Sequence, residues 1–214
     1  MTSYRFPARR RAAAAAAAVG AVLVLAACGG QDASTAKHSG HGAAPSGSPS
    51  GSTSASAHNA ADVSFAQGMI PHHRQAVEMA DLADGRASSA EVRTLASEIR
   101  KAQDPEIRTL SEWLTAWGED VPAKDAPAAE GAEHSGHSMA GMMADDEMAE
   151  LEKASGKTFD TAFLRMMVEH HEGAVEMART EQSRGAHQGA RKMAGAIVTS
   201  QTAEITRMNT LLGQ

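Results

Sequence analysis

A twelve-residue stretch that occurs twice constrains the fold of this chain more than any other feature of its sequence. The first copy, residues 69–80, reads MIPHHRQAVEMA, and the second, 98 residues later at 167–178, reads MVEHHEGAVEMA. Over the wider windows 65–83 and 163–181, nine of nineteen positions are identical without a gap. A fixed offset of this kind indicates an internal duplication, so we expect two halves of similar structure.

The spacing of apolar residues in both copies is typical of helices, and nothing in the pattern indicates strands. Helix-capping and stop signals predict long helices over 64–84, 89–117, 159–183 and 187–212, and a short one over 145–154. The predicted fold is therefore all-α, an antiparallel four-helix bundle built from a duplicated helical hairpin. We expect the bundle to span 62–214, with copies at 62–117 and 158–214 and a connection at 118–157.

The two histidines of each copy fall within the apolar face of their helix. On a helical wheel they lie on either side of Met69 in the first copy and of Met167 in the second. A buried ring nitrogen without a partner costs roughly 1–3 kcal/mol. One interpretation is structural, with the rings bonded to one another or to main-chain carbonyls. The other is that the rings bind a metal ion, and the thioethers one turn away favour this second interpretation.

The residue types available as ligands indicate copper. Cys28 is the only cysteine, and no Glu is followed three residues later by His, so thiolate sites and di-iron sites are both disfavoured. Imidazole and thioether together suit copper in either oxidation state. A second, flexible group lies in the connection, where the alternative is a low-complexity loop with accidental histidines. The predicted metal ligands are His72, His73, His170, His171, Met69, Met167, His134, His137, Met139, Met142 and Met143.

The N-terminus carries an export signal. Four arginines precede an apolar run, 12–27, which ends in Leu-Ala-Ala-Cys28 and resembles the lipobox of bacterial lipoproteins. We expect 1–28 to be a signal peptide, Cys28 to be lipidated, and 29–61, rich in Gly, Ser, Ala and Pro, to be a flexible tether. The alternative is an ordinary secretory signal with an incidental cysteine. Removing the four arginines takes the net charge from −6 to −10, which disfavours a nucleic-acid partner.

The duplicated pattern Phe-x-x-x-Met-[Ile/Val]-x-His-His-x-x-Ala-Val-Glu-Met-Ala, with Phe159-Asp-Thr-Ala-Phe163 before its second copy, resembles the bacterial family catalogued as domain of unknown function 305. The resemblance covers about 62–214. It implies a ferritin-like fold and an exported or membrane-anchored protein, and some members bind copper in the periplasm. The positions that match the family's motif are Met69, His72, His73, Met167, His170 and His171.

The expected function is that of an extracytoplasmic copper-binding lipoprotein, anchored in the cell membrane, that buffers or sequesters copper. A copper-dependent oxidase is one alternative, and a structural or interaction lipoprotein without metal is another. We find no activated nucleophile, nucleotide-binding loop or general acid/base pair, so the sequence does not favour an enzyme. It leaves the formation of a homo-oligomer open.

Overall fold

The computed structural model describes residues 57–124 and 140–213, and these residues form five helices. They are α1 (Ala60–Arg86), α2 (Ala90–Trp117), α3 (Asp145–Lys153), α4 (Gly156–Arg184) and α5 (Gln188–Leu212). The described residues contain no strand, only an isolated bridge between Ala87 and Gly156. The all-α prediction is confirmed. None of the described helices combines the length and the apolar character that crossing a membrane requires.

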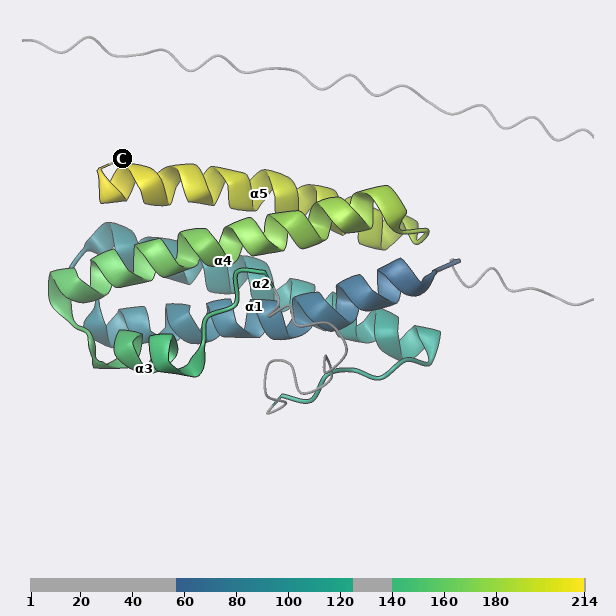
Figure 1. The fold of residues 1–214 in the computed structure, drawn as a ribbon, viewed down its shortest axis with the longest axis horizontal. Helices are drawn as coiled ribbons and strands as arrows, with labels where there is room; N and C mark the ends of the chain where they lie inside the picture. The colour runs from purple at the N-terminus through teal and green to yellow at the C-terminus, as the bar shows by residue number, and fades with distance from the viewer. Residues whose placement is uncertain (1–56, 125–139, 214) are drawn as a thin grey trace, which may run out of the picture. The chain divides into compact units, whose positions relative to one another are not determined.

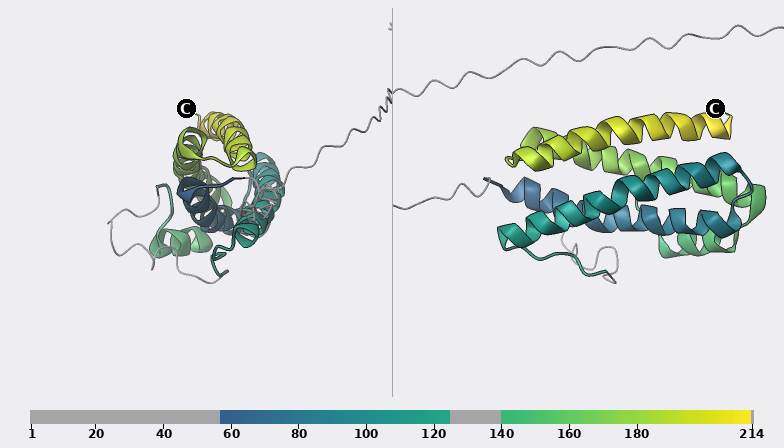
Figure 2. Two further views of the ribbon diagram at one scale, coloured as in Figure 1. Left: turned by 90° about the vertical axis from the view of Figure 1, so that its right-hand side faces the viewer. Right: turned by 180° about the vertical axis from the view of Figure 1, so that it is seen from behind.

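The four long helices form two hairpins, α1–α2 and α4–α5, which lie one on the other (Figures 1 and 2). Most of the contact between the hairpins is made by α1 against α4. These two helices run in opposite directions, because the first turn of α1 meets the end of α4 and the end of α1 meets the first turn of α4. The short helix α3 lies beside α1 and α4 (Figure 1).

Helix α1 begins earlier than its sequence signals predicted. The predicted helix begins at residue 64, but the observed cap is Asn59, whose side chain accepts from the N–H groups of Ala61 and Asp62. The Asp62 carboxylate accepts in turn from the Asn59 N–H, which completes a capping box. The helix therefore starts inside the range expected for the tether. Gly85, predicted as the stop signal, lies within α1.

Two aspartates join the hairpins at opposite ends. The carboxylate of Asp62 in α1 accepts from both main-chain N–H groups of residues 186–187, in the turn of the other hairpin, at 3.1 and 2.9 Å. Asp160 in α4 accepts in the same way from residues 88–89, in the turn of the first hairpin, at 3.1 and 3.0 Å. The two contacts are related by the 98-residue offset, since Asp62 corresponds to Asp160 and residues 88–89 correspond to 186–187. Each hairpin therefore supplies the aspartate of one contact and the turn of the other.

Glu181 adds a second buried carboxyl group beside Asp62. Its side chain is 1 % exposed, and burial, followed by the contact with Asp62, raises the pKa of Glu181 to about 8. Burial also opposes ionisation of Asp62, but three main-chain N–H donors outweigh it and hold the pKa of Asp62 below its usual range. At neutral pH Glu181 therefore carries a proton. Neither of its carboxyl oxygens has a hydrogen-bond partner among the described residues.

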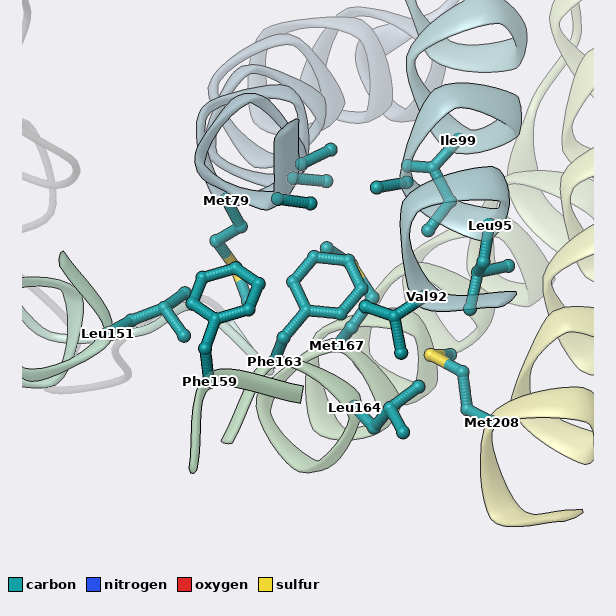
Figure 3. Packing of buried hydrophobic residues seen from close by; sticks show 14 of the residues in the cluster. Met79, Val92, Leu95, Ile99, Leu151, Phe159, Phe163, Leu164, Met167 and Met208 are labelled. Carbon is teal, nitrogen blue, oxygen red and sulfur yellow. The ribbon is translucent and has the colours of Figure 1, made fainter. Parts of the chain in front are cut away.

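The apolar interior consists of two clusters. One contains the second half of α1, the first half of α4 and the aromatic rings of Phe159 and Phe163, packed against residues of α2, α3 and α5 (Figure 3). The other contains the first half of α1 and the second half of α4 with residues of α2 and α5. Between the two clusters, both α1 and α4 carry their adjacent histidines, so the histidines form a polar layer inside an apolar core.

Candidate metal centre

The structure brings one histidine from each copy into direct contact. His72 of α1 and His170 of α4 have their ring centroids 3.8 Å apart, with the ring planes tilted by 47°. Both positions fall on the inward faces of their helices, and the rings are 0 % and 1 % exposed. We call these two residues the His72–His170 pair. It joins the two hairpins, because each ring comes from a different copy of the motif.

Both rings of the pair are neutral at physiological pH. Burial lowers the pKa of His72 to about 3, and the neighbouring ring of His73 contributes in the same direction. Burial, followed by the nearby ring of His72, holds the pKa of His170 well below its usual range. A neutral imidazole is the form that binds a metal ion, because one of its nitrogens then carries a free lone pair.

The hydrogen bonds of the rings decide which nitrogen of His72 is free. His72 Nε2 lies 3.1 Å from the main-chain oxygen of Ala140. A carbonyl oxygen can only accept, so Nε2 of the neutral ring carries the proton and donates it, and Nδ1 keeps the lone pair. That Nδ1 is buried, as are both nitrogens of His170 and the Nδ1 atoms of His73 and His171. None of these five atoms has a hydrogen-bond partner among the described residues, and we call them the orphan ring nitrogens.

The other two histidines are held by carboxylates. His73 Nε2 lies 2.7 Å from Glu106 Oε2 of α2, and His171 Nε2 lies 2.6 Å from Glu204 Oε2 of α5. These contacts are again related by the 98-residue offset. An imidazole that donates one N–H to a carboxylate has its orientation fixed and its other nitrogen made more basic, as metal-binding histidines in proteins require. His73 and His171 thus pair within their own hairpins and not with each other.

The predicted methionine ligands are placed differently from one another. Met69 and Met167 are fully buried, but they belong to different apolar clusters on either side of the histidines. Met143 is 7 % exposed and packs in the same cluster as Met167, while Met142 is half-buried. The remaining predicted sites, His134, His137 and Met139 in the connection and Cys28 at the N-terminus, lie outside the described residues.

The donor set fits a soft or borderline metal ion better than a hard one. In the described part of the chain, no group of three or more His, Cys, Asp or Glu side chains is arranged to hold a metal ion. The His72–His170 pair supplies nitrogen donors in a buried site, and its three orphan ring nitrogens have no hydrogen-bond partner among the described residues. A hard ion would require several oxygen ligands, whereas imidazole nitrogen suits copper and related metals.

The family assignment follows from a comparison of the whole helical region. The sequence profile described as "Domain of unknown function (DUF305)" matches residues 62–212. The chain belongs to the DUF305 family. The resemblance seen in the duplicated motif is therefore confirmed.

Solved structures similar to this DUF305 chain include proteins from two named bacteria. A candidate secreted DUF305 protein from Streptomyces coelicolor is 35 % identical, with a TM-score of 0.63, over 72 % of this chain and 92 % of that one. A DUF305 fragment from Deinococcus radiodurans is 32 % identical, with a TM-score of 0.63, over 72 % and 97 %. CopM in its Cu(I)-bound form is 30 % identical, with a TM-score of 0.57, over 70 % and 94 %. No curated protein matches the chain significantly.

The sequence did not predict a role for several residues in or near this DUF305 helical region. The main-chain oxygen of Ala140 is one, because nothing in the sequence of the connection shows where it returns to the helices. Gln103 and Gln201, which lie three residues before Glu106 and Glu204 in their helices, were not predicted either: both are buried and carry side-chain atoms with no partner within 57–124 and 140–213. The 98-residue offset pairs Gln103 with Gln201, and that pairing was the one available signal for them.

Proposed function

We propose that this DUF305 protein is an exported copper-binding protein that buffers or sequesters copper outside the cytoplasm. The observation that carries the proposal is the His72–His170 pair, in which two neutral, buried rings in contact leave three nitrogen atoms without partners. Leaving such atoms unsatisfied is costly in a buried core. A bound metal ion would satisfy two of them, His72 Nδ1 and the one nitrogen of neutral His170 that carries a lone pair.

Copper is the metal that the residue types support best. The donors available around the pair are imidazole nitrogens and, in the flanking clusters, thioether sulfurs, a combination that suits copper in both oxidation states. CopM, a relative of similar fold, has been solved in Cu(I)-bound, Cu(II)-bound and silver-bound forms. We extend copper binding from that relative to this chain because the pair supplies suitable donors. We assign His73, His171, Met69 and Met167 to the same helical site.

The proposal also includes the architecture and location expected from the sequence. The helical region would be a ferritin-like four-helix bundle, tethered through 29–61 to a lipid on Cys28 at the outer face of the cell membrane. A secreted relative is in keeping with export. A second, softer copper site would lie in the connection and use His134, His137, Met139, Met142 and Met143.

The experiment is a copper titration of the purified protein and of a double variant, His72→Ala with His170→Ala. The parent should bind copper stoichiometrically, and the double variant should lose the tightest binding phase while keeping any site in the connection. His58→Ala is the matched control, because His58 is exposed and stacks on Trp117, away from the pair. If the double variant titrates like the parent, the helical site is wrong. The quadruple variant, with His73 and His171 also replaced, then tests whether any of the four rings contributes.

A further inference from the structure

The two copies of the motif differ at the second position after the paired histidines, which is Gln75 in the first copy and Gly173 in the second. The Gln75 carboxamide donates to the main-chain oxygen of Met143 and accepts from its N–H, both at 2.8 Å. At Gly173 a Cβ atom would lie 1.9 Å from the main-chain oxygen of Ala140. One copy thus supplies hydrogen bonds and the other supplies space for the same short segment, residues 140–143, which we call the cover segment.

The cover segment lies directly against the His72–His170 pair. The oxygen of Ala140 accepts the hydrogen bond from His72. Gly141 has a φ of +79°, and a Cβ there would lie 2.5 Å from the main-chain oxygen of Glu169 and 3.1 Å from that of His170. Figure 1 shows the chain before α3 rising across α1 towards α4. The segment therefore packs on the backbone of α4 beside the pair, at a distance that excludes a side chain.

The position directly after the paired histidines also differs between the copies, and it holds the other end of the connection. Arg74 of the first copy donates to the main-chain oxygens of Pro122 and Ala123 at 2.9 and 2.8 Å, whereas the second copy has Glu172. In the first copy, Arg74 thus binds the connection after α2, and Gln75 binds it before α3. The departures from the duplicated motif therefore bind both described ends of the connection.

A cavity adjoins the cover segment. It has a volume of 460 Å³, lies between the first turns of α1 and the last turns of α4, and is lined by Ala140 together with Phe65, Met177, Glu176 and Glu181 among others. Ala140 therefore faces the cavity while its oxygen contacts His72. The rings of the pair are 0 % and 1 % exposed, and Ala140 touches both the cavity and the ring of His72.

We propose that the cover segment is a removable cover that controls the access of copper to the His72–His170 pair, and that Gln75 is the clasp that holds it closed. This inference rests on the proposed function. An ion cannot reach rings so deeply buried unless part of the structure moves, and the cover segment is a short non-helical stretch before α3. Opening it breaks the two Gln75 hydrogen bonds and the His72 hydrogen bond and draws the buried Met143 side chain out of its apolar cluster, but it leaves the helices intact.

The test compares two variants that loosen the cover in different ways. Gln75→Ala removes both hydrogen bonds to Met143. Losing one net hydrogen bond raises the population of the open form about fivefold, so losing both should raise it about 30-fold. Gly173→Ala places a methyl group where Ala140 now sits, while Ala itself favours the helix. The controls are Gln67→Ala, which removes a hydrogen bond to Asp120, and Gly195→Ala, whose Cβ would meet only the flexible Gln182 side chain, at 3.0 Å.

Two readouts separate the cover from the copper site. One is the rate at which diethyl pyrocarbonate acylates His72 and His170 without metal, followed by mass spectrometry of the peptides. The other is the rate of Cu(II) binding in stopped-flow measurements. Both rates should rise at least tenfold in Gln75→Ala and Gly173→Ala and stay at the parent's value in the two controls. Circular dichroism checks that each variant keeps its helices.

The outcomes are distinguishable. If acylation and copper binding are no faster in either variant than in the parent, the cover proposal is overturned while the copper function stands. A loss of copper affinity with an unchanged binding rate also overturns it, because the segment then positions His72 and does not control access. If acylation accelerates but neither parent nor variants bind copper, the cover is real and the proposed function fails.

Discussion

Replacing Glu181 with Gln should make the protein more stable above neutral pH. Because burial and the contact with Asp62 raise the pKa of Glu181 to about 8 from an ordinary value of 4.5, the folded state holds a proton that the unfolded chain releases. The stabilisation from this proton is complete below pH 4.5 and is lost as the pH rises to about 8. Gln keeps the shape of the side chain but cannot ionise, so the variant should not show this loss.

The size of the effect follows from the two pKa values. The lowered pKa values of His72 and His170 also make stability depend on pH, but they act on parent and variant alike and cancel in the comparison. Between pH 6.5 and pH 8, one carboxyl group with the shift of Glu181 should cost the parent about 1.5 kcal/mol of unfolding free energy. For a domain of this size that corresponds to about 3 to 6 °C in melting temperature. Thermal melts of parent and Glu181→Gln at both pH values measure it.

Glu176→Gln is the matched control, since Glu176 lies on the same helix and lines the same cavity but is exposed. It should follow the parent at every pH. If the stability of Glu181→Gln falls between pH 6.5 and pH 8 as steeply as that of the parent, Glu181 is ionised in the folded protein and the description of a protonated buried carboxyl group is wrong.

Three further results are expected. Replacing Glu106 and Glu204 together with Ala should weaken copper binding by about 10- to 100-fold, because both orient a histidine, and an unchanged affinity in isothermal titration would contradict this. Because burial lowers the pKa of His72 to about 3, copper binding at the pair should change little between about pH 7 and about pH 5. An ordinary imidazole would instead lose about 30-fold per ligand, which a competition titration would detect. Asp62→Ala removes the acceptor of three main-chain N–H groups and should lower the unfolding free energy by about 2–4 kcal/mol, measured by urea denaturation.

The sequence by itself determined the helices, the family and the face on which the histidines lie. Helical periodicity is a local property, so the spacing of His72 and His73 from Met69 was sufficient to predict that both rings point inwards. The start of α1 was predicted less well, because Asn59 and Ser64 are both good cap residues, and the contacts of Asn59 and Asp62 with the opposite hairpin favour the earlier start. The roles of the predicted ligands stay predictions.

Tertiary structure alone decided which of the four histidines meet and what surrounds them. Periodicity gives the direction of a side chain around its own helix, but not the relative position of two helices along their axes. That position brings His72 to His170 and leaves His73 and His171 to Glu106 and Glu204. The hydrogen bond from His72 to Ala140 could not be predicted either. Its acceptor is a main-chain oxygen, which every residue has, in a connection without periodic pattern, and only the packed fold brings it over the pair.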